Sequence, residues 1–132
     1  MNESTRPDPK VQISALSEVG RLMVEHDLPA VDVHVRADGV TVGLEAYDHA
    51  QHHGGPASVG DMLAMFEAWA AVLGAGEYAR HVSTTLGADG VWHQSASFWA
   101  DFAGRRWGFH GAAAVPVPLV RRSPRVRTAV SA

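Results

Sequence analysis

The chain of 132 residues contains no cysteine, and only one of its eleven basic residues is lysine. A disulfide framework, a thiol nucleophile and any cysteine-based zinc or iron–sulfur site are therefore excluded. Long hydrophobic runs are also missing. The longest candidate, MLAMFEAWAAVLGAG, is interrupted by Glu67 and is too short to span a bilayer. The N-terminal MNESTRPDPK is not followed by an apolar run of the signal-peptide kind. We therefore expect a soluble, cytoplasmic protein that does not bind membranes.

The composition predicts one globular domain followed by a basic tail. Apolar residues make up 46% of the chain and charged residues 19%, which is typical of a folded domain of this length. Residues 1–111 carry 14 acidic and 7 basic residues, whereas residues 112–132 carry four arginines and no acid. We therefore expect an α+β domain over 1–111 and a basic, proline-containing tail over 112–132.

The tetrapeptide ADGV occurs twice, at residues 37–40 and 88–91. Asp-Gly between two β-type runs predicts a hairpin with a type I′ turn, which needs positive φ at both central residues. Apolar and polar residues alternate around both copies, as in half-buried strands. The positions expected to face inward are Val31, Val33, Val35, Val40, Val42, Leu44 and Ala46 in the first hairpin, and Val82, Thr84, Leu86, Trp92, Ala96, Phe98, Ala100 and Phe102 in the second. A further turn at 103–105 leads into RWGFHGA, which predicts a fifth strand.

A helix is predicted before each hairpin. The first begins with Asp8 as N-cap and Pro9 at the first helical position, and ends at Leu28-Pro29. Its apolar spacing comes from Ile13, Leu16, Val19 or Gly20, and Met23. The second begins with Ser58 and Asp61, which resemble a capping box, and ends at Gly74 and Gly76. Its apolar stripe consists of Val59, Met62, Leu63, Phe66, Trp69 and Leu73.

These elements predict an α+β fold of two layers. The expected architecture is an antiparallel sheet of four to five strands with two helices on one face. The order of elements suggests a pseudo-repeat αββαββ with an extra strand, although chance reuse of a favourable turn explains the repeated ADGV equally well.

The other face of such a sheet is open to water or to a partner. Its expected partner-binding residues are His34, Arg36, Tyr47, His81, His93 and Trp99. A shift of one residue in register would expose Trp92 in place of Trp99. A non-enzymatic binding module that uses this face, with a protein partner or as a homodimer, is our first functional hypothesis. A merely solvated face is the alternative.

Two groups of histidines raise the possibility of an enzyme. His49, His52 and His53 lie in the segment DHAQHHGGP, and imidazole is a good zinc ligand, but their spacing matches no established site and a solvated linker explains them as well. His34, His81 and His93 on the open face are candidates for acid–base work. The GxSxG, HExxH, P-loop and GxGxxG motifs are all absent. We therefore expect no catalytic residues and no cofactor.

The arginines suggest a third hypothesis, a nucleic-acid-associated accessory protein. Arg121, Arg122, Arg125 and Arg127 follow an extended Val-Pro-Val-Pro stretch and have no acid nearby to pair with, so they could neutralise phosphates. The alternatives are a tail that folds back on the acidic body and a strand added to a sheet edge. Arg105 and Arg106 beside Trp107 and His110 could stack on bases, but we expect the two arginines to be solvent-facing turn residues.

The runs MLAMFEAWAAVLGAG and HVSTTLGADGVWHQSASFW resemble uncharacterised small proteins of actinobacterial chromosomes, phages and plasmids. The resemblance covers roughly residues 59–110. It implies an accessory protein of a GC-rich bacterium or its mobile elements, and it implies no activity or catalytic residues.

Overall fold

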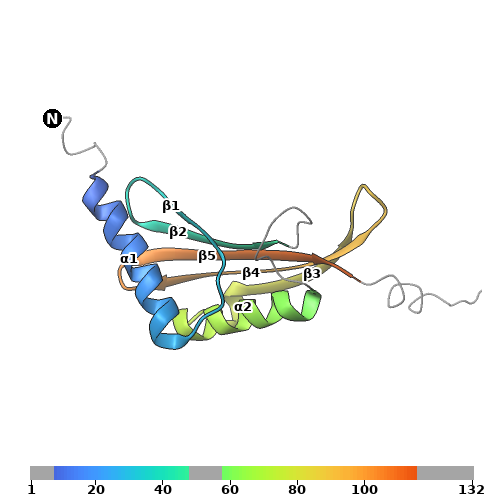
Figure 1. The fold of residues 1–132 in the computed structure, drawn as a ribbon. Helices are drawn as coiled ribbons and strands as arrows, with labels where there is room; N and C mark the ends of the chain where they lie inside the picture. Colours follow the sequence, from blue (N-terminus) through green and yellow to red (C-terminus); the bar gives the residue numbers. More distant parts are fainter. Residues whose placement is uncertain (1–7, 48–57, 116–132) are drawn as a thin grey trace, which may run out of the picture.

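The computed structural model describes residues 8–47 and 58–115 as an α+β fold with a five-stranded sheet (Figure 1). The helices are α1 (Pro9–His26), α2 (Val59–Leu73) and the short 3-10 helix η2 (Glu77–Ala79). The strands are β1 (Asp32–Val35), β2 (Thr41–Tyr47), β3 (Arg80–Leu86), β4 (Trp92–Phe102) and β5 (Arg105–Ala114).

Helix α1 has the predicted ends but buries only part of the predicted face. The Asp8 side chain accepts a hydrogen bond from the Lys10 N–H, and Pro9 occupies the first turn. The buried residues are Ala15, Val19 and Leu22. Ile13 and Leu16, which were expected to be buried, are about half exposed. The prediction was wrong for these two residues, although Val19 is buried and Met23 packs against the core, because α1 lies along the edge strand β1 and buries only a narrow stripe.

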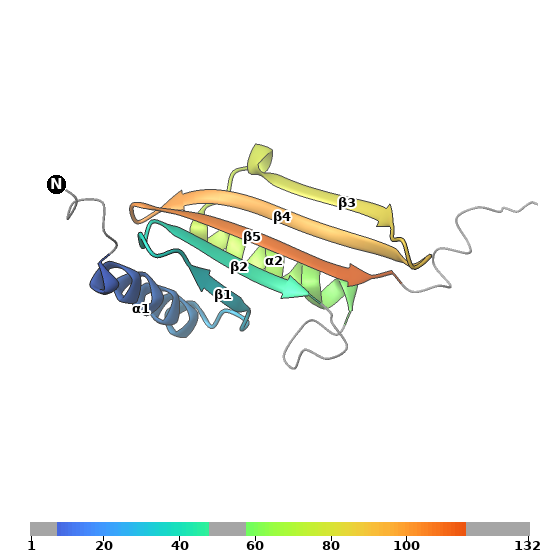
Figure 2. The same ribbon diagram turned by 90° about the horizontal axis from the view of Figure 1, so that it is seen from above.

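Helix α2 confirms the sequence pattern. Ser58 accepts a hydrogen bond from the Asp61 N–H at 3.1 Å, and Gly74 ends the helix in the left-handed conformation with φ of 70°. The helix packs against β2, β4 and β5, beneath the sheet in Figure 2. Its fully buried residues are Met62, Phe66, Trp69, Ala70 and Leu73.

Both ADGV segments form hairpin turns, but neither turn is type I′. Gly39 and Gly90 have positive φ, whereas Asp38 and Asp89 do not. Instead, each aspartate accepts a hydrogen bond at 2.9 Å from the N–H two residues later. Positive φ at both central positions occurs in the tight turn between β4 and β5, at Ala103 (53°) and Gly104 (76°).

The sheet is mixed, and this corrects the prediction of an antiparallel sheet. The strand order is β1-β2-β5-β4-β3, and β2 pairs with β5 in parallel while the other neighbours are antiparallel. The chain crosses from β2 through α2 to the far edge, and the β4–β5 hairpin then fills the space beside β2. The pseudo-repeat is not confirmed, since α2 covers the centre of the sheet whereas α1 flanks its edge.

The core lies between α2 and the sheet. Phe98 and Phe109 stack there with ring centroids 5.4 Å apart, and Trp69 donates its indole N–H to the Pro29 carbonyl oxygen at 3.1 Å. The end of the sheet formed by the β3–β4 hairpin extends beyond this cover. Val82 and Leu86 were expected to face inward, but their exposed fractions are 51% and 55%. They do lie on the helix side of the sheet, but α2 does not cover them.

Candidate functional site

The face of the sheet opposite α2 is uncovered in the part of the chain that the structure describes (Figure 2). Alternation along the strands sends Ala96, Phe98 and Ala100 into the core and the residues between them to the open face. Trp99 therefore lies on the open face, as predicted, with half of its surface exposed. Trp92 lies on the opposite face, so the alternative register is not the one adopted. We use "open face" for the residues of β1, β2, β3, β4 and β5 whose side chains point away from α2.

Small residues occupy several positions in the middle of the open face. The strand registers align His34, Gly43, Gly108 and Trp99 in one row across four strands. The two middle positions are glycines, so no side chain projects from the row between His34 and Trp99. The adjacent rows carry larger side chains, namely Glu45, His110 and His81 beside Ser97 on one side and Arg106 and Asp101 on the other. Small residues return in the next row, where Ala112, Ser95 and Ser83 follow Tyr47.

Trp99 is held in place by a charged neighbour. The Arg106 guanidinium lies 5.0 Å from the centroid of the Trp99 ring, within the range of a cation–π interaction. The same Arg106 donates a hydrogen bond to Asp101 Oδ1 at 3.1 Å. The indole ring is thus pre-oriented on the surface, which lowers the entropic cost of using it as a contact residue.

A second fixed pair lies at the other end of the open face. The Tyr47 hydroxyl is 2.7 Å from His110 Nδ1, and the two rings meet edge to face. Partial burial and the neighbouring carboxylate of Glu45 raise the pKa of Tyr47 above its ordinary value. Tyr47 was predicted as a site residue, whereas its partner His110 was not, because only the parallel pairing of β2 with β5 brings them together.

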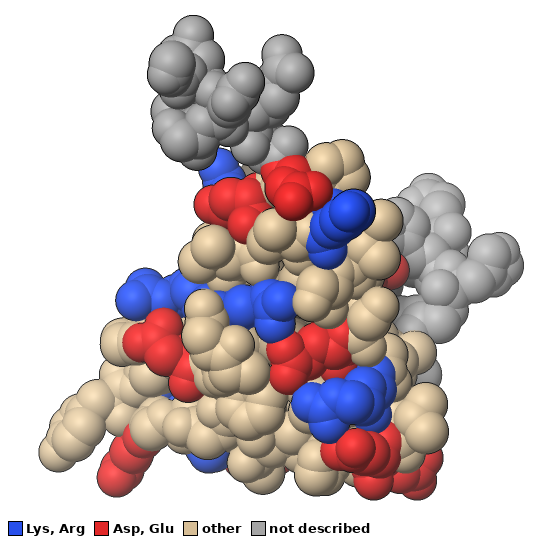
Figure 3. Space-filling view, turned by 90° about the vertical axis from the view of Figure 1, so that its left-hand side faces the viewer, with Lys and Arg blue, Asp and Glu red and all other residues tan. Residues whose placement is uncertain are grey.

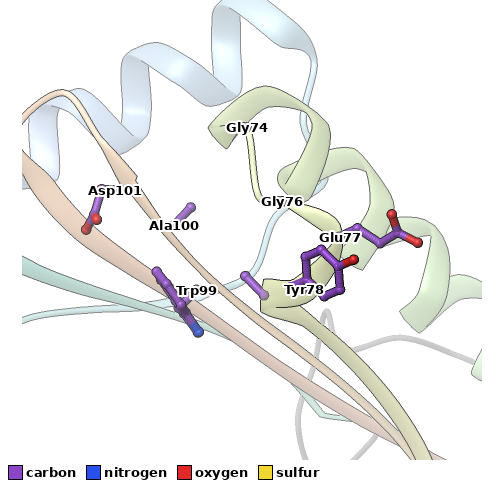
Figure 4. A pocket seen from close by; sticks show the side chains of 8 residues that line it. Gly74, Gly76, Glu77, Tyr78, Trp99, Ala100 and Asp101 are labelled. Atoms are coloured by element: carbon purple, nitrogen blue, oxygen red, sulfur yellow. The ribbon is translucent and has the colours of Figure 1, made fainter.

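A shallow pocket of about 310 Å³ adjoins Trp99 at the edge of the sheet (Figure 4). It forms where β4 extends past the start of β3, so that the turn containing η2 lies beside the uncovered edge of β4. The lining residues are Gly74, Gly76, Glu77, Tyr78, Ala79, Trp99, Ala100 and Asp101. Tyr78 and Trp99 are both exposed, and they give this corner of the molecule two aromatic side chains.

The predicted acid–base set does not converge. His34 is on β1 and His81 on β3, the two opposite edges of the sheet, which at about 4.8 Å per strand places them roughly 19 Å apart. His81 pairs with Ser97 and His93 with Thr85, four residues further along β3. His34 instead contacts Glu45 at 3.2 Å, and His93 lies 3.7 Å from Asp89.

No group of three or more metal-ligating side chains occurs among residues 8–47 and 58–115. His49, His52 and His53 lie outside the described residues, as do Arg121, Arg122, Arg125 and Arg127, so the metal and nucleic-acid hypotheses for them stay predictions. None of the described helices is long and apolar enough to cross a membrane.

Arg105 differs from the expected solvent-facing turn residue. Only 16% of its side chain is exposed, and it pairs with Glu18 of α1. It also donates a hydrogen bond to the Gly39 carbonyl oxygen at 2.9 Å. Arg36, another predicted site residue, is exposed just after β1. No sequence motif could have indicated the role of Arg105, since its partners are far away in the chain.

Comparisons with known proteins suggest no function, so a functional assignment rests on the geometry of the structure. No protein-family model matches the chain, and neither curated proteins nor solved structures give a match.

Proposed function

We propose that this protein is a non-enzymatic interaction module that binds a protein partner, or a second copy of itself, through the open face. The observation that carries the proposal is the floor of Gly43, Gly108 and Ser97 next to the pre-oriented indole of Trp99. Small side chains let the surface of a partner approach the sheet closely. A large aromatic anchor beside them is typical of interface hot spots.

The character of the open face supports a protein partner over a highly charged ligand. Its ionised groups are of both signs and largely pair with each other, as Arg106 does with Asp101. Hydroxyl groups fill much of the remaining surface, and Ser83 and Ser95 are hydrogen-bonded to each other at 3.1 Å. A mixed, nearly neutral surface with aromatic anchors resembles protein interfaces more than phosphate-binding sites.

The biological setting is proposed on sequence grounds. The absence of cysteine fits a reducing cytoplasm, and the resemblance noted above suggests an accessory factor of a GC-rich bacterium or one of its mobile elements. An enzymatic role is disfavoured because the open-face histidines are spread across the sheet instead of meeting at one point.

Differential capture tests the proposal. The tagged full chain, the Ser97→Arg variant and the Val24→Arg variant are expressed in the organism that encodes the protein, and the co-purified proteins are compared. Ser97→Arg places a long cation in the middle of the open face, whereas Val24→Arg adds the same charge on α1 at a residue that is 84% exposed. We expect a specific partner to be retained by wild type and Val24→Arg and lost from Ser97→Arg. Equal capture by all three forms would contradict the proposal.

A further inference from the structure

The two edge strands of the sheet differ greatly in how well they are protected against pairing with another chain. Strand β1 is four residues long, begins with the charged Asp32, and is flanked by α1. Gln12 of α1 donates its side-chain N–H to the Val35 carbonyl oxygen at 2.7 Å. These are familiar devices that prevent an edge strand from pairing with another chain. Strand β3, at the opposite edge, has no such cover from any residue that the structure describes.

The sequence of β3 also lacks the usual protection. RHVSTTL contains no lysine, proline or acidic residue, and its pairing with β4 runs without a bulge from Arg80 to Leu86. Val82 and Leu86 are about half exposed on the helix side. Apart from Arg80 at its start, β3 carries no formal charge, and a regular, partly apolar edge strand of this length is a template for strand addition.

The hairpin turn shows which backbone groups of β3 point outward. The Gly87 N–H donates to the Val91 carbonyl oxygen at 2.8 Å, so this pair is hydrogen-bonded across the β3–β4 ladder. Hydrogen-bonded and non-hydrogen-bonded pairs alternate in antiparallel sheets. The N–H and C=O groups of Val82, Thr84 and Leu86 therefore point away from β4, towards the free edge.

We propose that β3 pairs with β3 of a second copy, antiparallel about a twofold axis at Thr84, so that one sheet continues through a homodimer. In this register Val82 of each copy lies opposite Leu86 of the other, and the two Thr84 residues lie opposite each other. On the open face it sets Ser83 against Thr85. Aliphatic side chains thus meet aliphatic ones and hydroxyls meet hydroxyls, which makes the strand self-complementary as a twofold interface requires.

The charges at the ends of β3 fit the same arrangement. Arg80 stands at the start of the strand, and Asp89 lies in the turn that follows its end. Antiparallel pairing brings the Arg80 end of one copy alongside the Asp89 turn of the other. The Arg80 guanidinium already pairs with Glu67 of its own chain at 2.8 Å, so this arrangement brings no like charges together at either end. The dimer would also join the two open faces into one continuous surface.

The oligomeric state of the full chain tests the proposal. Sedimentation equilibrium of wild type is expected to show a monomer–dimer equilibrium in the micromolar range, and a chain that stays monomeric throughout that range would overturn the proposal. Thr84→Lys and Thr84→Glu each set like charges opposite one another across the twofold axis, and we expect each to weaken dimerisation by about tenfold or more.

Gln94→Lys is the matched control. Gln94 lies next to Thr84 on β4 and donates a hydrogen bond to its hydroxyl at 3.2 Å. The control therefore loses the same hydrogen bond and gains the same charge, but one strand away from the edge, and we expect it to dimerise like wild type. Circular dichroism verifies that all variants are folded.

Mixing the two Thr84 variants tests the register. Lysine and glutamate would then face each other across the axis, so equimolar Thr84→Lys and Thr84→Glu are expected to form a heterodimer at concentrations where each alone is monomeric. Failure of the mixture to dimerise, or undiminished dimerisation of the separate variants, would overturn the pairing. Ser97→Arg, which disturbs the centre of the open face, is expected to leave this dimer intact, so the outcome is independent of the proposed function.

Discussion

At the scale of single residues, the absence of a side chain at Gly111 lets α2 sit close to the sheet. A Cβ atom at this position would lie 2.9 Å from Met62 Cγ and 3.1 Å from the Ala46 carbonyl oxygen. Met62 is fully buried, so it has no free space into which to move. Gly108, three residues earlier on the same strand, faces the open side, and a Cβ there would meet nothing within 4 Å.

Replacing Gly111 is therefore expected to destabilise the fold. We expect Gly111→Ala to lower the free energy of unfolding by about 1–3 kcal/mol, the usual effect of overpacking a core. Urea denaturation measures this difference, with Gly108→Ala as the control that leaves stability nearly unchanged or slightly raised. Equal stability of the two variants would mean that α2 does not pack against β5 as described.

The pKa of Tyr47 gives a second prediction at this scale. The chain has two tyrosines, so Tyr78→Phe leaves Tyr47 as the only one. Its raised pKa in the folded state means that the neutral phenol is favoured by folding. The resulting stabilisation is fully present below the pKa of the unfolded chain and is lost as the pH rises through the pKa of the folded chain. An absorbance titration of tyrosinate is expected to give a higher pKa for the folded protein than for the protein in urea. Coincident curves would contradict the environment described for Tyr47.

At the scale of elements, Arg105 connects α1 to the turns of the β1–β2 and β4–β5 hairpins. Its guanidinium pairs with Glu18 of α1, and its Nε donates to Gly39 in the turn between β1 and β2. Figure 3 views this side of the molecule, where acidic and basic side chains lie next to one another. Because α1 buries few residues of its own, these polar contacts make a large relative contribution to holding it on the sheet.

Arg105→Met is expected to loosen α1. The variant leaves Glu18, which is only 15% exposed, without this cation, and we expect the free energy of unfolding to fall by about 2 kcal/mol. Amide hydrogen exchange in α1 should accelerate more than exchange in α2. Arg106→Met, at the next position, removes a side chain that is 57% exposed and serves as the control with little loss of stability. Uniform acceleration throughout the protein would argue against a local role of Arg105.

Local patterns predicted most of the elements but not their arrangement. The caps at Asp8 and Ser58 mark both helix starts, and period-2 alternation in β4 correctly assigned Phe98 inward and Trp99 outward. The buried face of α1 was not predictable in the same way. Ala15 gives little hydrophobic signal, whereas Ile13 gives a strong one and yet points away from the core. Which strand lies beside which depends on the crossover through α2, and no local pattern encodes it.

At the scale of the whole molecule, residues 8–47 and 58–115 form a sheet in which these residues cover one face and leave the other open, and protect one edge and leave the other free. The sequence was sufficient to place Tyr47, His81 and Trp99 on the open face, because the side-chain alternation of each strand is local. It was insufficient to say which of them are neighbours. His110 reaches Tyr47 only through the parallel contact of β2 with β5, and His34 is separated from His81 by the full width of the sheet.

The most direct test of the central claim is site-specific photo-crosslinking from the open face in the cells that encode the protein. A photoreactive phenylalanine derivative is placed at Ser97, in the middle of the open face, or at Val24 on the outside of α1. We predict a discrete crosslinked product from position 97, either to a partner or to a second copy, and none from position 24. The absence of any product from position 97, or the same products from both positions, would contradict the account of the open face as the surface through which this protein acts.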